Sequence, residues 1–172
     1  ADTNVSGASS TAGAITVTGG ASTTTVTTVD SAITALLAAH VGGAVTITDK
    51  NAASTTLAGT ITEVSVTNAA AVAVNSSALT TLNLTGKITS ADLDTLGALA
   101  TGALTSLTVN TSTMVMSGAL EVDAQVTTLN LANTGTSSIG DLDASGATTV
   151  NVSGSGKLTL SALTATAATS FV

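Results

Sequence analysis

The chain has 172 residues, of which 44% are apolar, 1% aromatic and 8% charged, so one continuous core of small branched side chains is expected. Ten acidic residues against three lysines give a formal net charge of -7, which repels nucleic acid and anionic lipid and excludes nucleic-acid binding. The absence of cysteine excludes disulfides and thiolate metal sites, and no apolar run reaches the roughly 18 residues of a transmembrane segment.

Residues 1–28 are polar and rich in β-formers. The alternating stretches Ile15–Val17 and Thr24–Val26 predict two short strands. A glycine pair between them marks a turn. We therefore expect an irregular first coil in this part of the chain.

Apolar residues take up helical spacing from Asp30 to Val41. Asp30 or Ser31 is a suitable N-cap, and a glycine pair follows the last apolar residue. This pattern predicts a helix over 30–41. His40, the only histidine, is then expected as a partly exposed residue at the helix end, where the dipole favours a cation, rather than in a catalytic triad.

A short phrase recurs along the rest of the chain, in which an apolar residue is followed by two polar residues and then by apolar, polar and apolar residues. Its five copies are Ile61–Val66, Leu79–Leu84, Leu104–Val109, Val126–Leu131 and Ala147–Val152. Their central residues lie 18 to 25 residues apart, which is the spacing of one strand per turn in a solenoid. The phrase predicts an all-β fold, a right-handed parallel β-helix with about 20–25 residues per coil and one or two short helices.

Further strands are expected between the phrases. The candidates are Val72–Val74, Met114–Met116, Ile139–Leu142 and Leu158–Leu160. The longest step between phrases contains Ser90–Ala100, where apolar spacing predicts a second short helix. We expect one domain, with the first coil and helix in residues 1–41 and the β-solenoid array in residues 42–172.

Strand alternation assigns the two sides of each phrase. Leu82 and Leu84 are expected to point inward, and their polar neighbours outward. Stacking the phrases by their central residues places Asn83 beside Thr108 and predicts a flat, nearly uncharged face of hydroxyls and amides. The residues predicted to form an interface on this face are Thr81, Asn83, Thr128, Asn130, Thr149 and Asn151.

A leucine-rich-repeat horseshoe shares the opening of the phrase and has to be weighed against the β-helix. That fold requires a buried Asn or Cys three residues after the last apolar residue of the phrase. The residues at these positions are Ala69, Lys87, Ser112, Thr134 and Ser155. A β-helix is therefore the better interpretation.

Three acid pairs are candidate calcium ligands, because calcium prefers carboxylate and carbonyl oxygens. They are Asp92 with Asp94, Glu121 with Asp123, and Asp141 with Asp143. The alternatives are solvated pairs at coil corners or, for the first pair, helix capping. Paired carboxylates also serve glycoside hydrolysis, but the chain has no arginine and no aromatic platform to hold a sugar, so no catalytic residue is predicted.

The runs Gly43–Asp49, Ala58–Val66 and Asn75–Gly86 are similar to the central region of the Caulobacter-type surface-layer (S-layer) protein and of related type I secreted, repeats-in-toxin (RTX) surface proteins. The resemblance implies a secreted, calcium-dependent lattice of β-solenoid subunits on the bacterial cell surface. It also implies attachment to lipopolysaccharide through regions outside this chain. The chain itself contains no Gly-Gly-x-Gly-x-Asp calcium repeat.

The sequence leads to three functional hypotheses. The first is a structural segment, expected to be a piece of a longer protein, that assembles with copies of itself into an extracellular lattice with calcium. The second is a binding module, either an adhesin stalk or a face that matches ice or a glycan. The third, an enzyme using the carboxylate pairs, is not expected.

Overall fold

The computed structural model describes residues 3–7, 14–30, 42–93 and 105–171. These ranges contain twelve strands, every strand pairing is parallel, and none of the described residues is helical. The strands are β1 (Thr3–Gly7), β2 (Ile15–Thr18), β3 (Thr25–Asp30), β4 (Val45–Thr48), β5 (Glu63–Asn75), β6 (Thr81–Asp92), β7 (Ser106–Glu121), β8 (Thr128–Asn133), β9 (Ser137–Asp143), β10 (Thr149–Ser153), β11 (Leu158–Thr164) and β12 (Ser170–Phe171). The prediction of an all-β, parallel architecture is confirmed. In the described part, no helix is long and apolar enough to cross a membrane.

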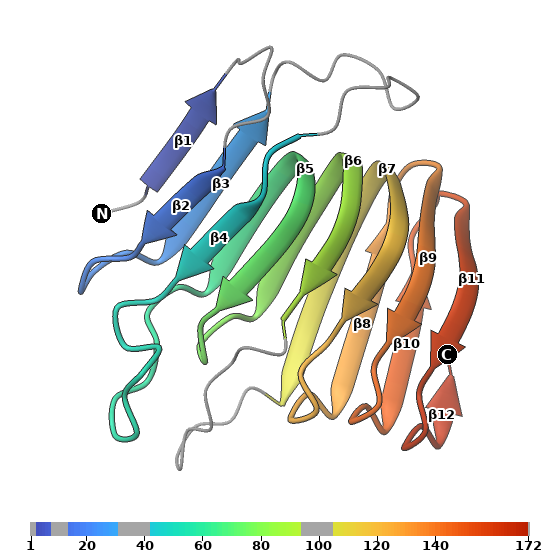
Figure 1. Cartoon of the computed structure of the whole chain (residues 1–172). Coiled ribbons are helices and arrows are strands. Elements are labelled where there is room, and N and C mark those ends of the chain that lie inside the picture. Colours follow the sequence, from blue (N-terminus) through green and yellow to red (C-terminus); the bar gives the residue numbers. More distant parts are fainter. Residues whose placement is uncertain (1–2, 8–13, 31–41, 94–104, 172) are drawn as a thin grey trace.

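The strands form two rows. The first row runs β1-β3-β5-β6-β7-β8-β10-β12, and the second row runs β2-β4-β5-β6-β7-β9-β11. Strands β5, β6 and β7 belong to both rows, because their first halves pair in one row and their second halves in the other. Figure 1 shows the strands side by side, from β1 at the blue end to β11 and β12 at the red end.

A single core of Val, Leu, Ile, Ala and Met side chains takes residues from both rows. In the first row, Val64, Leu82, Val109 and Leu131 follow one another on paired strands and are at most 2% exposed. Each buried residue alternates with a half-buried polar neighbour, as parallel pleated strands require. The in-and-out assignment of the phrase is therefore confirmed.

The first apolar residue of the phrase closes a turn that leads from the second row back to the first. In these return turns an N–H donates to a carbonyl three residues earlier, and the next first-row strand begins two residues later. The turns are Ser76–Leu79, Asp123–Val126, Ala144–Ala147 and Ala165–Ala168. Leu79, Val126 and Ala147 are buried at these corners. The spacing of the phrase thus reflects a turn followed by a strand.

The opposite corner, where a long strand passes from the first row to the second, requires unusual backbone angles. Asn68 in β5 and Thr113 in β7 have φ values of 60° and 47°, and Gly86 in β6 has a φ of 82°. The Asn68 side chain donates to Asp30 O at 2.8 Å and accepts from Lys87 N at 2.9 Å. A Cβ at Gly86 would collide with Asn68 Oδ1, so this crossing needs a glycine.

The predicted stacking of the phrases is wrong between β6 and β7. Asn83 pairs with Asn110 and not with Thr108, so the strands are offset by two residues from the expected register. A two-residue shift leaves every apolar side chain on the core face, so burial alone cannot select the register. The amide pair supplies a polar reason, because Asn110 Nδ2 donates to Asn83 Oδ1 at 2.7 Å.

The predicted helices have different outcomes. The expected helix over 30–41 falls, apart from Asp30 in β3, outside the described residues, as does His40. The helix expected over Ser90–Ala100 is wrong at its start, because Ser90 to Asp92 continue β6 and pair with β5 and β7. Residues 94–100 lie outside the described ranges. The four further strands are confirmed within β5, β7, β9 and β11.

Candidate functional site

The outer face of the first row carries a ladder of side-chain hydrogen bonds. Asn83 Nδ2 donates to Glu63 Oε1 at 2.8 Å and to Ser65 Oγ at 2.9 Å. Asn83 Oδ1 accepts from Asn110, so three neighbouring strands are linked by their outward side chains. Glu63 therefore has an amide donor beside its carboxylate on a face otherwise made of hydroxyls and amides.

The ladder continues on the last strands of the first row, displaced along the strand direction. Asn151 Nδ2 donates to Asn130 Oδ1 at 2.7 Å. Asn130 lies beside Thr108 rather than Asn110, because the β6–β7 offset is carried into β8. The six predicted interface residues therefore lie on one face, are half-buried, and fall into two ladder segments.

A column of exposed threonines at the return corner was not singled out from the sequence. Each Oγ1 donates to the backbone carbonyl of the equivalent threonine beside the neighbouring first-row strand, at 3.0 to 3.3 Å. The donors are Thr62, Thr80, Thr127, Thr148 and Thr169. The signal was present, because the second residue of every phrase is threonine.

The outer face of the second row is acidic. Asp92 pairs with Glu121, and Glu121 pairs with Asp143, so three carboxylate residues form a column on β6, β7 and β9. Like charges on directly opposed strand positions destabilise a sheet. Glu121 and Asp143 line a hollow of about 170 Å³ together with Ser145, whose N–H donates to Asp143 Oδ1 at 3.1 Å.

The remaining predicted calcium ligands are Asp123, Asp141 and Asp94. Asp123 is 4% exposed and accepts the Gln125 N–H at 2.7 Å inside a return turn, which is a structural role. Asp141 lies on β9 with a buried Oδ1 that has no hydrogen-bond partner in the described ranges. Asp94 lies outside these ranges. No three His, Cys, Asp or Glu residues of the described part are close enough together to hold one metal ion.

Asp49 is a buried carboxylate that the sequence did not single out. It is 2% exposed, and its Oδ1 accepts the Asn51 N–H at 2.9 Å. Its Oδ2 accepts from Thr60 N at 2.6 Å, Ile61 N at 2.7 Å and Ser76 Oγ at 3.0 Å. Burial opposes ionisation, but these donors outweigh it and hold the pKa of Asp49 below its ordinary value. The carboxylate fixes a loop at the corner between the rows.

Comparison of the chain with protein-family models and with curated proteins finds no match.

Proposed function

We propose that the chain is a structural segment of a secreted surface-layer protein, and that copies pack through the first-row outer face into a lattice on the bacterial cell surface. The observation that carries this proposal is the amide ladder, exemplified by the 2.7 Å bonds of Asn110 to Asn83 and of Asn151 to Asn130. Side chains that bond to one another along the stack leave a regular surface with little remaining freedom to lose on contact.

We further propose that the two rows are the faces of a right-handed parallel β-helix. Paired residues support it, since Thr81 lies 18 residues after its partner Glu63 and Thr149 lies 21 residues after Thr128. Parallel strands joined by crossovers are almost always connected in the right-handed sense. The 21-residue step lies within the expected coil of about 20–25 residues, and the 18-residue step is slightly shorter.

The distribution of charge supports assembly through the first-row face. Each chain has a net charge of -7, so copies repel one another wherever their acidic surfaces approach. The second-row column of Asp92, Glu121 and Asp143 is such a surface. Contact through the first row brings together hydroxyls and amides, and the acidic columns of neighbouring copies approach one another only where calcium lies between them.

We also propose that calcium is bound between copies. No three His, Cys, Asp or Glu side chains in the described part of one chain lie close enough together to hold a metal ion, but Glu121 and Asp143 lie beside each other at the edge of a hollow and supply carboxylate oxygens of the kind calcium prefers. Carboxylates of another copy would complete the ligand set. The resemblance of Gly43–Asp49 and Asn75–Gly86 to S-layer proteins supports the same assignment, with type I secretion and lipopolysaccharide attachment supplied by other regions.

Electron microscopy of the full-length protein with calcium and after chelation tests the proposal. We expect ordered sheets with calcium and their dissolution on chelation. A protein that stays monomeric at every calcium concentration would contradict the lattice.

A binding module is the second candidate, favoured by the exposed threonine column. Thr127, Thr148 and Thr169 repeat once per coil, at the roughly 4.8 Å spacing of neighbouring strands, which could match ice or a repetitive glycan. Thermal hysteresis of the purified chain tests the ice version. Its absence would remove that version and leave an adhesin stalk or glycan surface.

A further inference from the structure

Basic residues are scarce in this chain. It contains three lysines and no arginine, so an endopeptidase that cuts after lysine or arginine has three bonds to attack, after Lys50, Lys87 and Lys157. The longest loop of the described part joins β4 to β5 and projects beyond the ends of the strands in Figure 1. Residues 51–60 of this loop include no basic residue, and neither do the segments outside the described ranges. The position of each lysine in the fold therefore decides whether such an endopeptidase can cut the chain.

Lys87 lies inside a strand that is paired on both sides. It belongs to β6, which pairs with β5 and with β7, and its direct partner on β7 is Val115. Its backbone N–H donates to Asn68 Oδ1 at 2.9 Å. An endopeptidase must draw the backbone of its substrate into its cleft, so the segment has to leave the sheet before it is cut. Cutting after Lys87 therefore requires the centre of the sheet to open.

Lys157 has an exposed side chain, but the backbone around it is held. Its carbonyl accepts the Ser137 N–H at 2.8 Å, and the N–H of the preceding Gly156 donates to Asn133 O at 3.1 Å. The following residue, Leu158, begins β11 and pairs with Ser137. The bond after Lys157 therefore lies between residues that are bonded to neighbouring strands.

Lys50 is also exposed and lies at the start of the loop between β4 and β5. The Asp49 N–H before it donates to Asn75 O at 2.9 Å, and the Asn51 N–H after it donates to the buried Asp49 carboxylate at 2.9 Å. Ala52 N closes the turn onto Asp49 O at 3.1 Å. The backbone on both sides of Lys50 is thus fixed to the end of β5.

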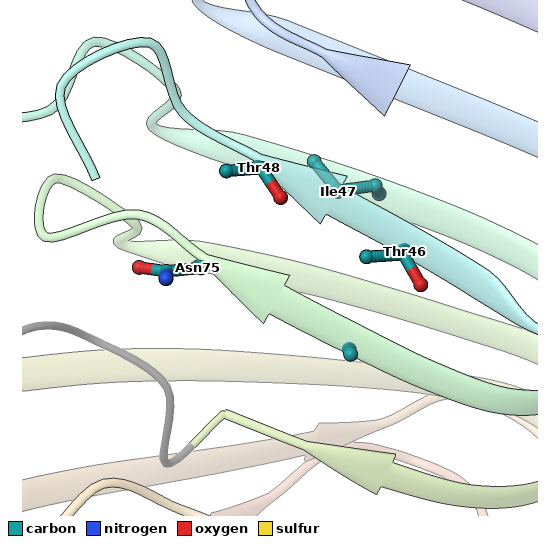
Figure 2. A pocket seen from close by; sticks show the side chains of 5 residues that line it. Thr46, Ile47, Thr48 and Asn75 are labelled. Carbon is teal, nitrogen blue, oxygen red and sulfur yellow. The ribbon is translucent and has the colours of Figure 1, made fainter. Parts of the chain in front are cut away.

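The side chain of Lys50 is exposed, so any protection of the bond after it comes from the backbone. A hollow of about 170 Å³ lies next to this turn and is lined by Thr46, Ile47, Thr48, Ala73 and Asn75. Figure 2 shows Thr48 and Asn75 at the ends of the two neighbouring strands. The hollow is smaller than the roughly 300–1,000 Å³ of small-molecule sites, so a bound ligand is not expected to cover Lys50.

We propose that this part of the protein has a further function, to withstand endopeptidases of trypsin specificity, and that it does so by confining its lysines to backbone that neighbouring strands hold. The side chains of Lys50 and Lys157 can enter the specificity pocket of such a protease, but the bonds after them are reached only after local opening. Residues 51–60 offer projecting backbone without the residue that the protease recognises. This resistance belongs to the single chain and does not depend on assembly.

Digestion of the 172-residue chain with trypsin and with subtilisin tests the resistance. Subtilisin has a broad specificity and needs no basic residue. We expect subtilisin to cut within residues 51–60, while trypsin at the same active-site concentration leaves the chain intact over the same time. Mass spectrometry of the fragments locates each cut. Trypsin cleavage after Lys50, Lys87 or Lys157 as fast as the subtilisin cut would overturn the proposal, and so would a loop that subtilisin leaves uncut.

Lysines placed at two kinds of exposed threonine test the part played by the backbone. Thr56→Lys puts a basic residue in the loop, where Thr56 N donates locally to Ser54 Oγ at 3.2 Å. Thr127→Lys puts one at a corner, where Thr127 N donates to Thr105 O at 3.0 Å. We expect trypsin to cut the first variant at least roughly tenfold faster. Thr148→Lys, whose N–H donates to Thr127 O at 2.8 Å, is a second corner position, so the comparison does not depend on one variant. Equal rates for the loop and corner lysines would overturn the proposal.

Sedimentation of the digested samples separates this resistance from assembly. Copies packed together would exclude a protease by themselves, so digestion is carried out after chelation on chain that sediments as a monomer. Trypsin cleavage of the monomer at its lysines, with ordered sheets in calcium, would overturn the resistance and leave the proposed lattice standing. A resistant monomer that never forms sheets would support the resistance and overturn the lattice.

Discussion

The two outer faces use the same strand alternation but satisfy their polar side chains differently. On the first row, Asn83 and Asn110 bond to each other across neighbouring strands. On the second row, Glu121 lies between Asp92 and Asp143, and three like charges follow one another. One core therefore supports a nearly uncharged face whose amides bond to one another and a second face that carries a column of carboxylates, which suits the first to packing and the second to solvent or cations.

Both faces depend on the shared core, so a charge placed there has the largest expected effect. Leu129→Asp puts a carboxylate at a fully buried position of β8 and should lower the free energy of unfolding by about 4 kcal/mol. Urea unfolding measures the change, with the neighbouring outward substitution Asn130→Asp as the control. Equal stability of the two variants would contradict the inward assignment.

The crossing of β6 from the first row to the second should be the next most sensitive to substitution. Gly86→Ala introduces a Cβ at a φ of 82° against Asn68 Oδ1 and should destabilise the chain by about 2 kcal/mol. Gly20→Ala is the matched control, because its Cβ would meet only Thr23 Oγ1 at 3.6 Å. Thermal unfolding of both variants decides whether the crossing needs its glycine.

Asp49 fixes the loop at the corner between the two rows, and the loss of stability on replacing it should depend on pH. Because its pKa is lowered on folding, its contribution is present above the ordinary value of about 3.9 and is lost as pH falls through the folded pKa. Asp49→Asn should cost about 1–3 kcal/mol at neutral pH. The difference from the unmodified protein should shrink as urea unfolding is repeated towards pH 2. A constant difference across this range would contradict the ionised clip.

Removing one hydrogen bond from the amide ladder of the first-row face should have a smaller effect on stability. Asn110→Ala removes the donor to Asn83 Oδ1 and should cost about 1 kcal/mol, with little dependence on salt. Ser112→Ala, a polar position on the same strand, is the control. Urea unfolding at low and high salt gives both values, and a strong salt dependence would contradict the hydrogen-bonded character of the ladder.

Removing a charge from the acidic face should raise the stability of the chain, whereas the preceding substitutions lower it. Glu121→Gln relieves repulsion from Asp92 and Asp143 and should stabilise the chain by about 0.5 kcal/mol at low ionic strength, with the gain vanishing at high salt. Thermal unfolding at two salt concentrations measures it. Destabilisation at low salt would show that Glu121 makes a favourable interaction in the isolated chain.

Features that repeat along the chain could be predicted from the sequence, and features that occur only once could not. Alternation in Leu79–Leu84 predicted the buried and outward sides, because a period of two is a local property. The β6–β7 register was missed, since two registers bury the same apolar side chains. Acids were paired within a strand, as Asp141 with Asp143, whereas the structure places Glu121 beside Asp143 across strands.

Asp49 shows the same limit at a single residue. Its donors Thr60, Ile61 and Ser76 lie 11 to 27 residues away along the chain, so no local pattern marks the site. The hollow at Asn75 likewise forms between β4 and β5 and has no local signature. The repeated threonine of the phrase, in contrast, could have predicted the corner column.

The most direct test of the account is electron microscopy of the full-length protein carrying one added charge on either face. Thr128→Glu changes a half-buried outward position of the first row, and Ser138→Glu changes the matched position type on the second row. We predict that Thr128→Glu abolishes the calcium-dependent sheets while Ser138→Glu retains them. Sheets that survive Thr128→Glu with unchanged spacing would contradict assembly through the first-row face.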